Sequence, residues 1–172
     1  MPSLLSTWRK IISSYKPCKI RGAYWYRAVL KSRKKTILTM DGAFLYGGRY
    51  NTAEDFGALY LSESTEGCIA EITRRPGSPD NYVVGEIEVT LEKVCDLTDA
   101  RFLRKLEISE DQLIGDDLAE TQLLGELVRG AGFEGMIVPS AAGDFTNLII
   151  FIDNLSAKSK IRLENVHDSP LP

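Results

Sequence analysis

Three side chains with the chemistry to bind and cleave a charged ligand are spaced eleven residues apart in the first half of the sequence: Arg49, Tyr60 and Glu71. Arg49 follows Gly47 and Gly48, and glycines let a backbone turn sharply and bring its amides close to a ligand. An arginine at such a turn can bind a phosphate through two parallel hydrogen bonds. Taken alone, Arg49 is more simply interpreted as a surface residue after a hairpin turn.

Tyr60 lies in the segment ALYLS, which has the composition of a short buried strand. Alternation along a strand puts Leu59 and Leu61 on one face and Tyr60 and Ser62 on the other. A tyrosine on a face that lines a pocket can stack on a planar ring. The commoner role of such a residue is that of a half-buried strand tyrosine.

Glu71 stands among small and apolar residues, with Gly67 and Cys68 one helical turn before it. One interpretation is a solvated helix residue paired with Arg75 at the i+4 position. The other is a carboxylate that points into a cleft, where it stabilises a developing positive charge or binds ribose hydroxyls. The sequence alone leaves both interpretations open.

Three more polar residues lie in or beside predicted strands. Ser140 follows a strand and a proline, Asn147 opens the next apolar strand, and Arg27 lies within the aromatic segment YWYRAV. A serine or asparagine at a strand end ordinarily caps a turn, and each can also donate a hydrogen bond to a ligand. Periodicity does not decide which way Arg27 points.

The combination is more specific than any member of it. Arg49, Tyr60, Glu71 and Ser140 would supply a phosphate grip, an aromatic stack, a carboxylate and a hydroxyl. Those groups are sufficient to hold a dinucleotide and to break a glycosidic bond that departs with development of positive charge.

Other kinds of catalysis have less support. The single histidine, His167, lies in the polar end of the chain, so Ser-His-Asp and Cys-His mechanisms are disfavoured. Cys18, Cys68 and Cys95 are far apart and form no CxxC pair, so we predict no metal site.

Composition indicates one ordinary soluble domain. The chain has 172 residues, 44% hydrophobic and 26% charged, with a net charge of −3. This charge disfavours direct nucleic-acid binding, and the basic run KSRKK is interpreted as a solvated turn. No apolar run is long enough for a membrane span and the first residues do not resemble a secretory signal, so we expect a cytoplasmic protein without membrane contact.

Around these residues the sequence predicts a mixed, mainly antiparallel α+β domain. Strands are predicted at AYWYRAVL, AFLYGGRYN, ALYLS, YVVGEIEVT, VCDL, GMIV, NLIIF and KIRLE. Three helices are predicted at the segments SLLSTWRKIIS, DARFLRKL and DDLAETQLLGELVRGAG. Two more are predicted from their start signals: one begins after an N-cap at Ser64, and one begins at a capping box of Ser109 and Gln112. In chain order, the helix after Ser64 is the second of the five. Pro76-Gly77 is predicted to end the second of these helices.

The order of the candidate residues resembles the RES-domain family, bacterial toxins named for an arginine, a glutamate and a serine. The motifs that carry the resemblance are Gly47-Gly48-Arg49-Tyr50-Asn51, Leu59-Tyr60-Leu61, Glu71, Thr121-Gln122, Gly125, Val138-Pro139-Ser140-Ala141, Asn147 and an early strand arginine, Arg27. Tyr50 stands where the family usually has Trp. We therefore predict an N-terminal extension over 1–20 with a short helix, a RES domain over 21–155, and a C-terminal strand and polar tail over 156–172.

The resemblance implies an ADP-ribosyltransferase-like fold, with a split, mainly antiparallel sheet around an NAD cleft and flanking helices. It implies a toxin of a bacterial type II toxin–antitoxin system that depletes NAD⁺ by hydrolysis or phosphorolysis of the nicotinamide–ribose bond. Carried over by position, Glu71 would stabilise the oxocarbenium-like transition state. Arg49 would hold the NAD phosphates or ribose, and Tyr60 would stack on the nicotinamide.

The resemblance also implies what the protein binds. NAD would be bound as a substrate, with Arg27, Ser140 and Asn147 completing the cleft and with no metal. A cognate antitoxin with an Xre-type DNA-binding domain would cover the active site. Two alternatives remain at this stage: an ADP-ribosyltransferase that modifies a protein target, and an inactive RES-like module that binds only a nucleotide or a partner.

Overall fold

The structure is a computed structural model that describes residues 1–74 and 81–168. Its elements, in chain order, are α1 (Leu4–Ser13), β1 (Cys18–Leu30), the 3-10 helix η1 (Lys31–Thr36), α2 (Asp41–Tyr46), β2 (Leu59–Ser62), α3 (Thr65–Thr73), β3 (Tyr82–Asp96), α4 (Ala100–Leu106), α5 (Glu110–Ile114), α6 (Ala119–Gly130), β4 (Gly135–Pro139), β5 (Thr146–Ile150), the 3-10 helix η2 (Ile152–Asn154) and β6 (Lys160–Asp168).

The strands form one mixed sheet in the order β1-β2-β5-β4-β3-β6, and β1 also pairs with β3. Only the β3–β4 pair is parallel among the described strand pairs. Because β1 pairs with both β2 and β3, five of the strands close into a ring, with β6 outside it on β3. The expected α+β class with a mainly antiparallel sheet and flanking helices is confirmed.

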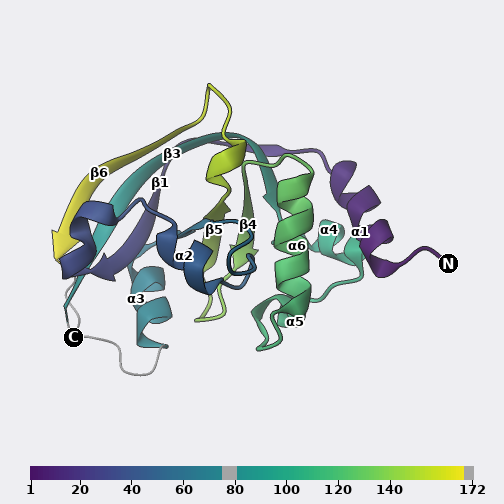
Figure 1. The fold of residues 1–172 in the computed structure, drawn as a ribbon, viewed down its shortest axis with the longest axis horizontal. Coiled ribbons are helices and arrows are strands. Elements are labelled where there is room, and N and C mark those ends of the chain that lie inside the picture. Colours follow the sequence, from purple (N-terminus) through teal and green to yellow (C-terminus); the bar gives the residue numbers. More distant parts are fainter. Residues whose placement is uncertain (75–80, 169–172) are drawn as a thin grey trace.

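Two apolar cores sit on either side of the strands β2, β5 and β4. One joins strands that are not hydrogen-bonded neighbours, such as Leu61 of β2 and Ile87 of β3, and so fills the inside of the ring. The other lies between the opposite faces of the same strands and the helices α1, α4, α5 and α6 (Figure 1). The side chains of Tyr60 and Ile149 face this second core.

The N-terminal helix is part of this second core. Trp8 and Ile12 of α1 are fully buried, and the indole Nε1 of Trp8 donates a hydrogen bond of 2.9 Å to the carbonyl of Leu106 in α4. The helix begins after an N-cap, Ser3, whose hydroxyl accepts from the amide of Ser6.

Two expected elements were wrong. The segment 43–46 was expected to be a strand because AFLY is aromatic and apolar, but it forms the end of helix α2. Asp41 lies in the first turn of α2, and Gly47, with φ of 73°, ends it. VCDL is not a separate strand: it continues β3, which pairs first with β1 and β6 and then with β4. The predicted stop at Pro76-Gly77 lies outside the described residues.

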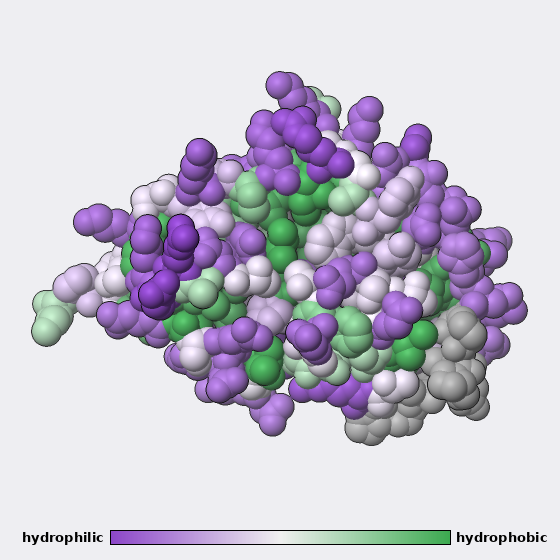
Figure 2. Space-filling view, turned by 180° about the vertical axis from the view of Figure 1, so that it is seen from behind, coloured by the Kyte–Doolittle hydropathy of each residue, from purple (hydrophilic) through white to green (hydrophobic). Residues whose placement is uncertain are grey.

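In Figure 1 the helices α2 and α6 lie in front of the sheet, and α3 lies below it. The opposite face, in Figure 2, is covered mostly by hydrophilic and intermediate residues, with smaller hydrophobic groups between them. Within the described part of the chain, no helix has both the length and the apolar character needed to cross a membrane.

Candidate functional site

Helix α3 directs Glu71 towards the sheet. The helix begins at Ser64, whose hydroxyl accepts a 3.0 Å hydrogen bond from the amide of Gly67. Gly67 and Cys68 are buried against the strands. Glu71 is four and three residues beyond them and therefore shares their face of the helix. The small residues flanking Glu71 in the sequence are those that let α3 approach the sheet closely.

Glu71 is held by two side chains from the neighbouring strand ends. Its Oε1 accepts a 2.7 Å hydrogen bond from the hydroxyl of Ser140 and a 2.9 Å hydrogen bond from Nδ2 of Asn147. Its Oε2 has no hydrogen-bond partner among the described residues. These contacts bring Glu71 together with Ser140 and Asn147, and Arg75, its other proposed partner, lies outside the described residues.

The β4–β5 connection fixes the hydroxyl of Ser140. Its Oγ accepts from the amide of Ala142 at 3.1 Å, and the Ser140 amide donates to the carbonyl of Phe145 at 2.9 Å. With the acceptor role of Oγ taken by Ala142, the hydroxyl proton points to Glu71. Asn147 opens β5 opposite Val138, so the two donors come from adjacent strands.

A second set of contacts holds the loop of residues 47–51 through side-chain hydrogen bonds. The Tyr60 hydroxyl donates to Oδ1 of Asn51 at 2.7 Å and accepts from the amide of Tyr50 at 3.0 Å. Buried Asn51 donates through Nδ2 to the carbonyls of Ala43 and Phe56. A Cβ on Gly48 would lie 2.5 Å from the Tyr60 oxygen, so that position requires glycine. The structure thus gives the Tyr60 hydroxyl a loop-holding role.

Helix α6 supports the same loop through residues whose roles the sequence did not reveal. Gln122 donates through Nε2 to the carbonyl of Gly48 at 3.0 Å. Gly125 lies so close to the loop that an added Cβ would be 1.8 Å from the carbonyl oxygen of Tyr50. Their spacing of three residues on one helix was the available signal, because it puts both on one face.

Arg49 projects from this loop towards the end of α5. Its Nη1 donates to the carbonyls of Leu113 and Gly115, at 3.2 and 2.5 Å. These carbonyls lie at a helix C-terminus, where acceptors are left without helical partners. A guanidinium carries five N–H donors, so the edge made by Nε and Nη2 remains available, and Arg49 forms no ion pair with a described residue.

Arg27 lies in β1 beside Tyr26, which pairs with Ser62. Its Nη1 donates to the carbonyls of Ile37 at 2.8 Å and Thr39 at 2.7 Å, which joins β1 to the segment before α2.

Burial keeps the phenols and thiols around the site protonated. Burial raises the pKa of Cys68 to about 12, with Glu71 adding to the rise and Arg27 opposing it. The pKa of the Tyr50 phenol is likewise raised, mainly by burial, with Glu71 adding to the rise and Arg49 opposing it. Cysteine nucleophiles require depressed pKa values, so Cys68 is not one.

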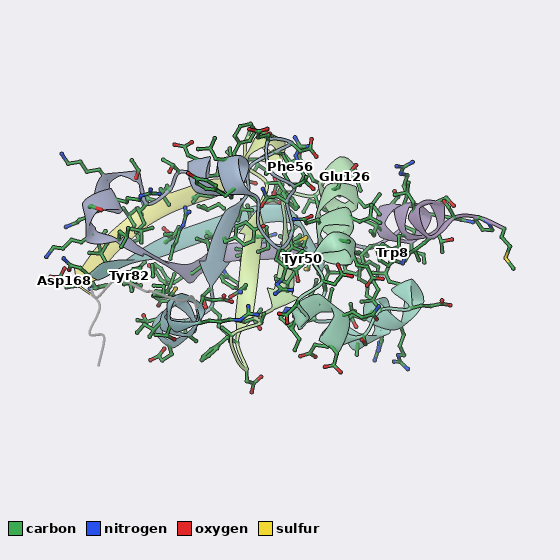
Figure 3. All side chains as sticks on the ribbon, turned by 60° about the horizontal axis from the view of Figure 1, so that its bottom comes forward. Trp8, Tyr50, Phe56, Tyr82, Glu126 and Asp168 are labelled. Atoms are coloured by element: carbon green, nitrogen blue, oxygen red, sulfur yellow. The ribbon has the colours of Figure 1, made fainter. Side chains whose placement is uncertain are left out.

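Figure 3 shows Tyr50 and Phe56 near the middle of the molecule, with Trp8 towards the α1 end and Tyr82 and Asp168 at the other end. His167 lies in β6, outside the ring of strands, and pairs with Val84 of β3. Across the ranges that the structure describes, no three His, Cys, Asp or Glu side chains are grouped closely enough to hold a metal ion.

Comparison with known proteins identifies the class. The RES domain family matches residues 8–171, and this chain belongs to that family. The match extends beyond the residues 21–155 that carry the motifs, and it includes Trp8 and Ile12 of α1.

Two relatives and one solved structure are informative. The NAD(+) phosphorylase MbcT of Mycobacterium tuberculosis (strain ATCC 25618 / H37Rv) is 30% identical over 118 residues, 63% of this chain and 63% of MbcT. The probable NAD(+) phosphorylase Rv3189 of the same organism is 32% identical over 129 residues, 72% of this chain and 60% of that protein. The chain therefore matches less than two thirds of the length of either relative.

The fold is that of a solved toxin. The crystal structure of the M. tuberculosis MbcT–MbcA toxin–antitoxin complex contains a chain that matches with a TM-score of 0.83 and 23% identity, over 97% of this chain and 94% of that one. This likeness confirms the expected fold.

Proposed function

We propose that this chain is an NAD⁺-cleaving toxin that transfers the ADP-ribosyl group of NAD⁺ to inorganic phosphate. The observation that carries the proposal is the anchored carboxylate of Glu71, fixed by Ser140 and Asn147 on one oxygen. Membership of the RES domain family and the phosphorylase names of two relatives support the same reaction.

In this reaction the bond between C1 of the nicotinamide ribose and the pyridinium nitrogen breaks, and the electron pair stays on the nicotinamide. A phosphate oxygen bonds to C1, and the phosphate proton is released. Positive charge develops on the ribose between these events. A carboxylate held in place before the reaction stabilises that charge without reorganisation. Oε2 of Glu71 is the oxygen left for this role or for the ribose hydroxyls.

The remaining residues bind NAD. The unused edge of Arg49 has the fork geometry that binds a phosphate through two hydrogen bonds. Tyr60 stacks its ring on the nicotinamide while its hydroxyl holds the loop. Arg27 adds positive charge for the phosphates, and the reaction needs no metal.

The first test is loss of NAD⁺ with purified protein, with and without inorganic phosphate. Glu71→Gln keeps an oxygen for Ser140 and Asn147 but removes the charge, so turnover should fall about 100-fold or more. The free energy of unfolding should change by no more than about 1 kcal/mol. Glu126→Gln, an exposed change on α6 that Figure 3 labels, is the matched control and should retain full turnover.

Each other outcome has a distinct meaning. Loss of NAD⁺ that does not depend on phosphate would replace phosphorolysis by hydrolysis. Loss that needs an added protein would indicate an ADP-ribosyltransferase. Normal turnover by Glu71→Gln would remove Glu71 from the mechanism, and NAD⁺ binding without cleavage would indicate a binding module.

We further infer that a cognate antitoxin, carrying an Xre-type DNA-binding domain, covers this site. Phe44, Leu45 and Tyr46 of α2 are exposed by 40%, 53% and 84%. They run directly into the loop that carries Arg49, so a protein that blocks the loop would also bury them. The fold match to a chain from a toxin–antitoxin complex supports an antitoxin as that protein.

A further inference from the structure

Two buried polar atoms on the paired strands β2 and β5 have no hydrogen-bond partner among the described residues: the hydroxyl oxygen of Ser62 and Oδ1 of Asn147. Leaving such an atom unpaired costs free energy, so each calls for a structural explanation. Asn147 is the residue whose Nδ2 holds Glu71. The partner of Oδ1, the other polar atom of the same amide, therefore affects how Nδ2 is placed against Glu71.

The two atoms belong to residues that face each other. Ser62 ends β2 and pairs in register with Asn147 of the antiparallel strand β5. Directly opposed residues of an antiparallel pair put their side chains on the same face, with Cβ atoms about 5 Å apart. Ser62 has a proton to donate, and Oδ1 of Asn147 needs a donor.

Helix α3 encloses the Ser62 hydroxyl. Ser62 is only 4% exposed, and a Cβ on Gly67 would lie 2.1 Å from its oxygen. The glycine therefore makes room for a hydroxyl that bulk water does not reach. Because no described residue is in hydrogen-bonding geometry with this hydroxyl, one bound water is the partner that can satisfy it.

An asparagine amide has two ends of similar shape, and only one of them can donate to Glu71. A donor at Oδ1 fixes the orientation in which Nδ2 points to the carboxylate. We propose that Ser62 is a positioning residue: its hydroxyl bonds Oδ1 of Asn147 through one bound water, and so orients the amide that holds Glu71. The effect of Ser62 on catalysis rests on the proposed function, whereas the hydrogen bond itself does not.

The test is Ser62→Ala, with Ser159→Ala as matched control, because Ser159 also bonds within a buried network, at Glu134, away from the site. The side-chain amide signals of Asn147 in a ¹⁵N-labelled sample, assigned by their loss in Asn147→Asp, should shift in Ser62→Ala and stay in place in Ser159→Ala. Because Glu71 acts in the transition state, kcat should fall about fivefold, the equivalent of one hydrogen bond, with KM within about twofold.

Unchanged Asn147 signals in Ser62→Ala would overturn the hydrogen bond, whether or not the protein cleaves NAD⁺. Shifted signals with unchanged kcat would overturn the positioning role. If Ser62→Ala does not fold, Ser62→Cys offers a weaker donor in nearly the same volume. It should give smaller changes of the same kind, and unchanged signals there would again contradict the proposal.

Discussion

At the scale of single residues, the two charged groups of the site each use one atom for hydrogen bonds within the protein. A second oxygen or nitrogen of the same group has no hydrogen-bond partner among the described residues. Glu71 uses Oε1 for its two anchors, and Arg49 uses Nη1 for two carbonyls. Both charged groups are therefore held in place while part of each remains for a ligand. A pre-arranged charge of this kind is what transition-state stabilisation requires.

Tyr60→Phe separates the two roles given to this tyrosine. The substitution keeps the ring but leaves Oδ1 of Asn51 and the amide of Tyr50 without their partner. We expect the free energy of unfolding to fall by about 1–3 kcal/mol, measured by urea denaturation. Tyr46→Phe, at an exposed tyrosine, should leave stability unchanged. Equal stability of the two variants would contradict the loop-holding role.

Glu134 makes the stability of the fold depend on pH in the acidic range. Burial alone would raise its pKa, but hydrogen bonds from Ser159, Ser156 and the amide of Glu92 outweigh burial and lower it. A lowered folded-state pKa contributes stability that is present above the unfolded pKa and is lost as pH falls through the folded one. Glu134→Gln should therefore flatten the decline in stability below about pH 5, followed by thermal unfolding across pH. An unaltered pH profile in this variant would rule out that contribution.

At the scale of elements, glycines set how closely helices approach the site. Gly125 brings α6 against the loop 47–51, and Gly67 brings α3 against β2. Neither contact has space for a methyl group. The position of each helix is therefore coupled to the residue that it covers.

Gly125→Ala and Gly130→Ala compare two glycines of α6. The first would place a Cβ 1.8 Å from a backbone oxygen, whereas the second meets nothing within 4 Å. We expect Gly125→Ala to destabilise by about 1–3 kcal/mol or more and to reduce NAD⁺ cleavage with the displaced loop. Gly130→Ala should be neutral or stabilising, because alanine favours helix. Denaturation and activity assays of both variants would show this difference, and equal effects would contradict it.

Local patterns were sufficient to predict most elements. Strand alternation at 59–62, the N-cap Ser64 and the capping box of Ser109 and Gln112 all appear as expected. The segment 43–46 was wrongly predicted as a strand because its aromatic residues favour that structure. In the fold it forms the end of helix α2, which Gly47 terminates. Such a choice depends on the tertiary structure.

The sequence predicted only part of the candidate site, because the other contacts also depend on the tertiary structure. Spacing and resemblance selected Glu71, Ser140 and Asn147, and the structure joins them. Arg49 and Arg27 each donate to backbone carbonyls, which no side-chain pattern reveals. The support from Gln122 and the unpaired atoms at Ser62 and Asn147 depend on contacts between distant elements, so they required coordinates.

At the scale of the whole molecule, the exposed residues of α2 lead directly into the loop that carries Arg49. If an antitoxin covers these residues, Tyr46→Ser should weaken its binding about tenfold, because a buried aromatic contact contributes more than 1 kcal/mol. NAD⁺ cleavage by the free protein should be unchanged. Leu4→Ser, at an exposed residue of α1, is the control in calorimetric titration with the cognate antitoxin. Unchanged affinity for Tyr46→Ser would exclude α2 from the interface.

The long sequence separation between Glu71 and its anchors has a consequence during protein synthesis. Ser140 and Asn147 follow Glu71 by 69 and 76 residues, and β2 must pair with β5 before these residues meet. A ribosome that adds about 5–20 residues per second needs on the order of 10 s to cover this distance. The nascent chain therefore carries its carboxylate without anchors for that interval. The topology itself delays assembly of this cluster until β5 has been synthesised.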